Sequence, residues 1–200
     1  MAQAQGKVTP KNDSAGVEVN ICQPQWIDEQ ETFKIANSPP RTANLTFSGA
    51  DLNYLARVLY AESSGAGILP DESDRRIEKE ALLNVFYFRL NRKGYPRNDY
   101  IAKTFSMVCN AAGQFDSLQP KPRPKFINSG NPKYKALGKS ECSDLQESID
   151  AVKAFIAGGP NSKYIYDNFR SRSSRHSGTI IGNSKFWLSE LGKEESDAVR

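Results

Sequence analysis

The residue with the clearest capacity for chemistry is Glu62. It follows Leu52, Leu55 and Leu59, which recur at helical spacing, so it projects from the same apolar face of a helix. A carboxyl group on an apolar face loses hydration, and this loss favours its protonated form. A protonated carboxyl group is a general acid, which cleavage of a glycosidic bond requires. Periodicity alone is equally compatible with a structural ion pair at this position.

A second candidate set is Cys109, His176 and Asn183, which occur in the order of a nucleophile, a base and an orienting group. This set would suit an amidase or an endopeptidase. It depends on the single histidine of the chain, which lies in the polar loop sequence Arg-Ser-Ser-Arg-His-Ser-Gly. The cysteine enzyme is therefore the weaker alternative, and it stays open.

A metal site is disfavoured. Cys109, Cys142 and His176 could supply zinc ligands, but zinc sites usually contain a closely spaced ligand pair, and none is present here. The sequence also contains no glycine-rich phosphate loop and no Gly-x-Ser-x-Gly elbow. We therefore expect no metal and no cofactor.

The charge of the chain leaves a third class of function open. Lysine and arginine outnumber aspartate and glutamate by 27 to 23, which gives a net charge of +4. This mild excess favours approach to anionic polymers without choosing among nucleic acids, lipid headgroups and cell walls. A non-enzymatic basic binding module is thus an alternative to an enzyme. Lys163, Arg170, Arg172, Arg175 and Lys185 give the late region a positive charge that could contact acidic peptide stems or a nucleic acid, or could belong to a solvated loop.

The three cysteines, Cys22, Cys109 and Cys142, allow at most one disulfide. Reduced thiols in a protein made in the cytoplasm are the simpler interpretation. The first 20 residues lack the apolar segment of a secretory signal, so other machinery would have to deliver the protein to any substrate outside the cytoplasm. No run of about 18 apolar residues occurs, so we expect no membrane span.

Hydrophobic periodicity predicts the elements that position these groups. A helix is expected from Ser48, which has an acidic residue three positions later, to Glu62, with Ser-Ser-Gly as its end. Further helices are expected over residues 74–92, 99–109 and 144–157, the last stopped by Gly-Gly-Pro. Residues 164–166 and 179–181 are β-prone, and the proline-rich residues 119–131 form an irregular loop.

These elements predict a mainly α (α+β) fold with a minor β element. We divide the chain into a polar N-terminal arm or linker (1–46), one domain (47–190) and a C-terminal tail (191–200). The arm contains a candidate strand at 17–21, and Trp26 and Phe33 could dock on the domain. The length of 200 residues suits a single domain.

Four sequence blocks occur together in an informative order. Residues 56–65 read Ala-Arg-Val-Leu-Tyr-Ala-Glu-Ser-Ser-Gly, and residues 88–96 contain Phe-Arg-Leu-Asn-Arg followed by Gly-Tyr-Pro. Residues 113–117 read Gly-Gln-Phe-Asp-Ser. Residues 164–166 and 181–187 read Tyr-Ile-Tyr and Ile-Gly-Asn-Ser-Lys-Phe-Trp. Over residues 51–188 this order resembles the spore-cortex-lytic (SleB-type) family of cell wall hydrolases.

The resemblance implies a lysozyme-like helical domain that cleaves peptidoglycan between N-acetylmuramic acid and N-acetylglucosamine. Glu62 matches the catalytic glutamate. Members are typically lytic transglycosylases, in which one glutamate protonates the leaving oxygen and then helps the 6-hydroxyl of muramic acid attack the anomeric carbon. A hydrolytic muramidase would need a second carboxylate, for which Asp116 is the one candidate. The 1,6-anhydro route needs none.

We expect Gln114, Phe115, Tyr166 and Asn183 to line the substrate groove, since amides and phenols bind N-acetyl and hydroxyl groups and aromatic faces pack on sugar rings. Phe186 and Trp187 are expected in the core. The sequence also departs from the family. Ala66 and Gly67 stand where a second glutamate is common, residues 68–74 form an insertion, and Ser184 replaces a histidine.

The expected partners are peptidoglycan glycan strands, with no nucleic acid. The setting is either a phage lysin or an antibacterial effector that acts in the periplasm or outside the cell. An effector would have a cognate immunity or inhibitor protein that plugs the groove.

Overall fold

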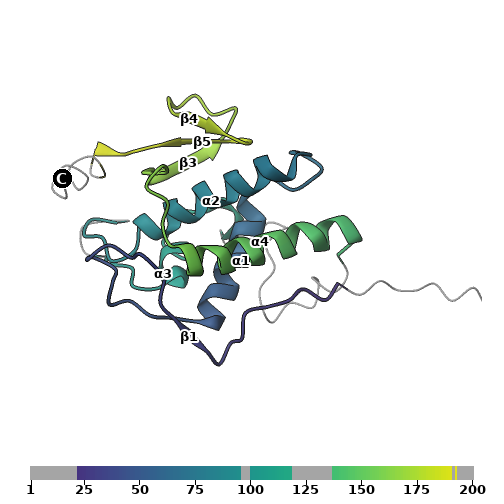
Figure 1. The fold of residues 1–200 in the computed structure, drawn as a ribbon. Coiled ribbons are helices and arrows are strands. Elements are labelled where there is room, and N and C mark those ends of the chain that lie inside the picture. The colour runs from purple at the N-terminus through teal and green to yellow at the C-terminus, as the bar shows by residue number, and fades with distance from the viewer. Residues whose placement is uncertain (1–21, 96–99, 119–136, 191, 193–200) are drawn as a thin grey trace, which may run out of the picture.

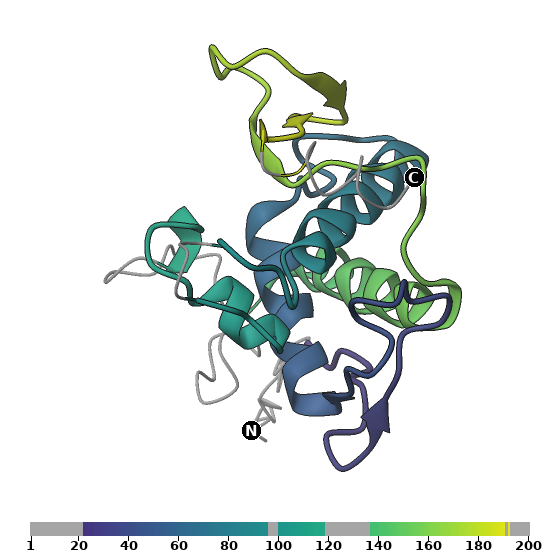
Figure 2. The ribbon, with the colours of Figure 1, turned by 90° about the vertical axis from the view of Figure 1, so that its left-hand side faces the viewer.

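The computed structural model describes residues 22–95, 100–118, 137–190 and 192. Helices pack around a central helix, and a three-stranded sheet lies at one end of the molecule beside the second helix (Figures 1 and 2). The helices are α1 (Gly49–Glu62), α2 (Glu72–Phe88), α3 (Phe105–Cys109) and α4 (Lys139–Gly158). The architecture is therefore mixed α+β with helices predominant, as the sequence predicts.

Helix α1 lies at the centre of the core. Ser48 is its N-cap, and the Ser48 hydroxyl accepts a hydrogen bond from the backbone N–H of Asp51 at 3.2 Å. Leu55 and Leu59 are fully buried, since α3 and α4 both pack on this helix. It ends at Glu62 because Ser63 is extended. The predicted start and end of this helix are confirmed.

Helix α2 starts close to its predicted position, with Asp71 as N-cap, but it ends at Phe88. The predicted continuation to Arg92 is wrong. Asn91 has a φ of 48°, which a right-handed helix does not allow. The Asn91 side chain donates instead to the backbone oxygen of Arg41 at 2.6 Å, so a tertiary contact replaces the helical turn.

The remaining helices differ from expectation at their starts. α3 begins at Phe105, because Thr104 caps it by accepting from the backbone N–H of Met107 at 3.2 Å. Asp99, the predicted start, lies outside the described residues. α4 begins at Lys139, five residues before Asp144, and ends at Gly158, one residue after the predicted end. A short 3₁₀ helix spans Asp116–Leu118.

The main sheet contains β3 (Asn168–Ser171), β4 (Thr179–Ile181) and β5 (Ser184–Trp187), in the order β3-β5-β4 with antiparallel pairing. The strand predicted at Thr179–Ile181 is confirmed. The one predicted at Tyr164–Tyr166 is wrong, since β3 starts only at Asn168. A two-stranded pair, β1 (Thr32–Phe33) with β2 (Phe47–Ser48), precedes α1. The candidate strand at 17–21 lies outside the described residues.

The segment before α1 packs closely on the helices. Ile27 and Ile35 are buried in the core cluster. A disulfide joins Cys22 to Cys142, in the first turns of α4, with 5.6 Å between their Cα atoms. The expectation of reduced thiols is therefore wrong for this pair. Sequence spacing could not reveal the bond, because the two cysteines are 120 residues apart.

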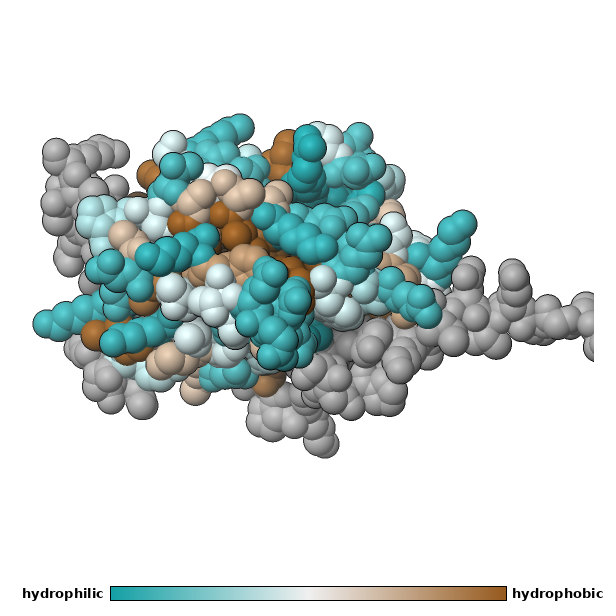
Figure 3. Space-filling view, turned by 60° about the horizontal axis from the view of Figure 1, so that its bottom comes forward, coloured by the Kyte–Doolittle hydropathy of each residue, from teal (hydrophilic) through white to brown (hydrophobic). Residues whose placement is uncertain are grey.

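The face drawn in Figure 3 is mostly polar, with a limited apolar area among the polar side chains. In the part of the chain that the structure describes, no helix has the length and apolar character needed to cross a bilayer. Five large apolar side chains are exposed among the described residues: Ile68, Ile101, Met107, Ile165 and Ile180.

Candidate active site

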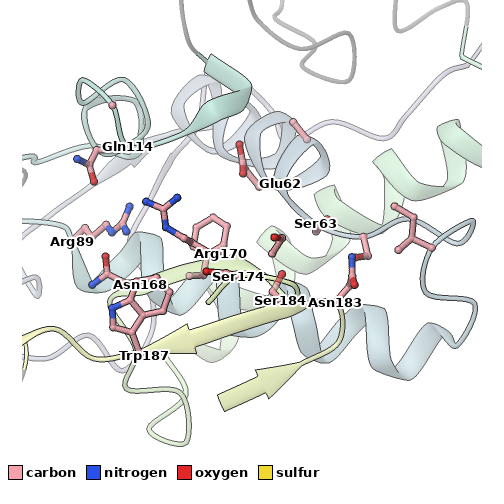
Figure 4. A pocket seen from close by; sticks show the side chains of 16 residues that line it. Glu62, Ser63, Arg89, Gln114, Asn168, Arg170, Ser174, Asn183, Ser184 and Trp187 are labelled. Carbon is pink, nitrogen blue, oxygen red and sulfur yellow. The ribbon is translucent and has the colours of Figure 1, made fainter. Parts of the chain in front are cut away.

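A cleft of about 820 Å³ lies between the C-terminal end of α1 and the sheet. Its described lining comes from the α1 end and the loop after it, the loop before the 3₁₀ helix, all of β3, and both ends of β5 (Figure 4). The lining is mostly polar. It comprises Ala61, Glu62, Ser63, Ser64, Ile68, Arg89, Gly113, Gln114, Asn168, Phe169, Arg170, Ser171, Ser174, Asn183, Ser184 and Trp187.

Glu62 is half-buried in this cleft as the last residue of α1. Its Oε1 accepts a hydrogen bond from the backbone N–H of Ser117 at 3.2 Å. Within the part of the chain that the structure describes, the second carboxyl oxygen remains available to a ligand. A carboxyl group fixed by one backbone donor and facing a polar cleft can donate and recover a proton.

A buried carboxylate holds the two sides of the cleft together. Glu78 of α2 is completely buried, and its Oε2 accepts from the backbone N–H of Ser64 at 2.8 Å. Its Oε1 accepts from the backbone N–H of Asn183 at 3.0 Å and from the Ser184 hydroxyl at 2.7 Å. The chain just after Glu62 and the β4–β5 turn therefore share one anchor.

A second set of contacts fixes the loop after α1. Buried Lys79 donates to the backbone oxygen of Ser64 and pairs with Glu147, each at 3.3 Å. The Arg75 guanidinium binds Glu147 through two hydrogen bonds of 2.9 and 2.6 Å, which lower the pKa of Glu147. Burial lowers the pKa of the Lys79 ammonium.

Helix α4 contributes directly to the same loop. Asp144 Oδ1 accepts a hydrogen bond from the backbone N–H of Ala66 at 2.9 Å. Gly65 fits closely against this carboxylate, because a Cβ at residue 65 would lie 2.1 Å from Oδ2 of Asp144. A side chain at residue 65, three residues after the end of α1, would therefore require the Asp144 carboxylate to move.

The predicted site residues are only partly brought together. Gln114 and Asn183 line the cleft with Glu62. Phe115 lies in the core instead, where its ring contacts Phe86 at a centroid distance of 5.0 Å. Tyr166 is half-buried and packs on Phe186, and it is not among the described lining residues. Asp116 begins the 3₁₀ helix, but its side chain lies outside what the structure describes.

The sheet contributes residues that sequence reasoning missed. Phe186 is buried as expected, whereas Trp187 lines the cleft. The two rings of Trp187 and His176 stack at a centroid distance of 4.8 Å and an angle of 8°. Arg89 and Asn168 also line the cleft and were not singled out. The alternation of β5 separates Phe186 from Trp187, so recognising it as a strand would have placed their side chains on opposite faces.

The geometry gives no support to the cysteine alternative. Cys109 is buried and is not among the described lining residues, and burial raises the pKa of its thiol well above its ordinary value. His176 instead stacks on Trp187. Among the described residues, no group of three His, Cys, Asp or Glu side chains is arranged to hold a metal ion.

The chain matches no protein-family model, no curated protein and no solved structure. The resemblance to cell wall hydrolases therefore depends on the sequence blocks alone.

Proposed function

We propose that this protein is a peptidoglycan-degrading glycosidase that cleaves the bond between N-acetylmuramic acid and N-acetylglucosamine, with Glu62 as the general acid/base. The observation that carries the proposal is the position of the Glu62 carboxyl group, half-buried in a long polar cleft and held by the Ser117 N–H. The ordered sequence blocks and their resemblance to a lysozyme-like family support the same function.

The lining of the cleft suits a glycan. Gln114, Asn168 and Asn183 present amide groups, which can donate to and accept from N-acetyl and hydroxyl groups. Hydroxyl groups of Ser63, Ser64 and other serines add further partners. A cleft that is open and polar accepts a hydrated polymer more readily than a small apolar ligand.

Between the two reaction types, we propose the lytic transglycosylase. Glu62 is the one carboxylate among the described residues that line the cleft, a set that does not include the side chain of Asp116. Inverting and retaining hydrolases use two carboxyl groups on either side of the scissile bond. A single glutamate is sufficient when the 6-hydroxyl of muramic acid is the nucleophile, because the same group first donates and then accepts the proton.

The disulfide supports action outside the cytoplasm. Disulfides such as Cys22–Cys142 form and persist in oxidising compartments, which include the periplasm and the cell exterior. We therefore propose that the protein reaches the cell wall, either as a lysin or as an effector. We also propose that α1 and the sheet are arranged around the cleft as in lysozyme-like proteins.

The test is release of soluble fragments from purified, dye-labelled sacculi. We expect Glu62→Gln to lower the rate by about 10²–10⁴-fold, the usual contribution of a general acid/base. Glu31→Gln, at an exposed position remote from the cleft lining, serves as the matched control and should retain full activity. Equal, measurable release by wild type and Glu62→Gln would refute Glu62 as the acid/base, and the absence of release by the wild type would refute the enzyme and favour a basic binding module.

A further inference from the structure

The wall of the cleft formed by the sheet carries a cation and an aromatic ring. All four residues of β3 line the cleft, and Trp187 joins them from β5. The register places Asn168 opposite Trp187 and Arg170 opposite Lys185. Side chains of directly paired residues lie on the same face of a sheet, so Asn168, Arg170 and Trp187 share one face.

Arg170 supplies the positive charge on this wall of the cleft. Arg170 is exposed, and within the described ranges no ion pair involves its guanidinium. Figure 4 shows its side chain extending from β3 toward the part of the cleft that holds Gln114 and Glu62. A guanidinium in this position can bind a carboxylate through two parallel N–H···O bonds.

A second guanidinium adds to the positive potential of the cleft. Arg89 is buried and is held by the backbone oxygen of Asp167 at 2.9 Å and the hydroxyl of Tyr95 at 3.1 Å. Both acceptors are neutral, so these contacts fix Arg89 without cancelling its charge. The described lining thus contains two guanidinium groups, Arg89 and Arg170, and one carboxylate, Glu62.

Trp187 forms a flat, supported surface at one end of the cleft. His176 stacks on one face of its indole ring, which restrains the ring. Trp187 and Asn183 lie at opposite ends of the cleft (Figure 4). Four residue steps lead from Asn183 through β5 to Trp187, and in extended chain they span about 13 Å, which exceeds one sugar ring.

We propose that Arg170 is a specificity-determining residue that binds a carboxylate of the substrate, while Trp187 stacks on a sugar ring at its end of the cleft. The carboxylate belongs either to the lactyl side chain of muramic acid or to the peptide stem attached to it. The cleft therefore selects acidic glycan strands over neutral N-acetylglucosamine polymers. This inference rests on the proposed function.

The experiment measures binding by titration calorimetry to the Glu62→Gln protein, which prevents turnover. One probe is neutral N-acetylchitotetraose. The other two are the peptidoglycan tetrasaccharide with free lactyl carboxylates and the same tetrasaccharide with its peptide stems. We expect Arg170→Gln to weaken binding of at least one acidic probe by about tenfold, with chitotetraose changed less than about twofold. The acidic probe that is weakened identifies the carboxylate.

Two variants complete the design. Arg172→Gln removes an exposed charge that is not among the lining residues, and it should change no affinity by more than about twofold. Trp187→Ala should weaken all three probes, because stacking does not depend on charge. Thermal melting checks that each variant is folded.

The proposal is overturned if Arg170→Gln weakens the neutral and acidic probes by the same factor, or changes none of them. If either result accompanies normal fragment release by the wild type, the specificity inference fails and the proposed function stands. If none of the probes binds and the wild type releases no fragments, both fail.

Discussion

The buried carboxylate of Glu78 accepts a hydrogen bond from the backbone N–H of Ser64 at 2.8 Å. Ser64 lies two residues after Glu62, and Glu78 also binds the β4–β5 turn through Asn183 and Ser184. The relative position of the two sides of the cleft is therefore set by one side chain that itself lies beneath the cleft and is completely buried. We therefore expect Glu78 to act as a positioning residue for Glu62.

Replacement of Glu78 by Gln should damage both stability and turnover. The amide group would present N–H donors where the carboxylate accepts from N–H and O–H groups, and an unsatisfied buried donor costs about 1–3 kcal/mol. We expect a lower melting temperature and a lower kcat. Glu72→Gln, at an exposed position on the same helix, is the control and should change neither by a comparable amount. An unchanged kcat in Glu78→Gln would show that this anchor does not position Glu62.

A side chain at residue 65 should lower the stability of the folded chain. The Cβ of Gly65→Ala would lie 2.1 Å from Oδ2 of Asp144, and Asp144 cannot move freely because it holds the N–H of Ala66. We expect a loss of about 1–3 kcal/mol in unfolding free energy, measured by urea denaturation, from overpacking. Gly67→Ala is the matched control, since nothing lies within 4 Å of its Cβ. Equal stability of the two variants would contradict the packing described.

The Cys22–Cys142 disulfide should stabilise the folded chain by about 2–5 kcal/mol, as expected for a bond that closes a long loop. The double variant Cys22→Ser, Cys142→Ser should melt at a lower temperature than the oxidised wild type. Added reductant should lower the wild-type melting temperature and leave that of the double variant unchanged. A reductant effect of the same size on both proteins would rule out this bond as its source.

Cys109 should be dispensable for activity. Its thiol is buried and is not among the described cleft-lining residues, so Cys109→Ala removes a small packing group and no catalytic group. We expect fragment release from sacculi to remain within about twofold, with a modest loss of stability. Abolished activity in a folded Cys109→Ala protein would revive the cysteine enzyme.

The contacts of Glu147 predict a dependence of stability on pH. Its pKa lies below the ordinary value of 4.5, chiefly because Arg75 donates to the carboxylate. A lowered pKa in the folded state means that the stabilisation is fully present above pH 4.5 and is lost as the pH falls through the lowered value. The melting temperature of the wild type should be higher than that of Glu147→Gln at neutral pH, and this difference should become smaller in acid. A difference in melting temperature that does not change with pH would contradict an ionic contribution of Glu147 to stability.

Local sequence signals predict the part of the site that belongs to α1. The Ser48 cap, the leucine spacing and the Ser-Ser-Gly end together place Glu62 at a helix terminus, because each signal acts within a few residues. The contacts that complete the cleft act over long separations. Glu78 meets Ser184 across 106 residues and Cys22 meets Cys142 across 120, and no local pattern encodes such pairs.

Errors in the predicted site have a common physical origin. Phe115 and Trp187 are both aromatic, and composition cannot tell which one enters the core. The packing of Phe86 and Phe169 draws Phe115 inside, while the β5 register directs Trp187 toward the cleft. Helix α2 likewise ends early because Asn91 binds Arg41, a contact that hydrophobic periodicity does not reveal.

The proposed catalytic step is proton transfer from the Glu62 carboxyl group to the leaving oxygen of the glycan strand. Mass analysis of the fragments released from purified sacculi tests it most directly. We expect the wild type to release 1,6-anhydro muropeptides, which are lighter by one water molecule than hydrolytic products, and Glu62→Gln to release neither kind. Fragments with ordinary reducing ends would contradict the transglycosylase route, and undiminished release by Glu62→Gln would contradict the role of Glu62.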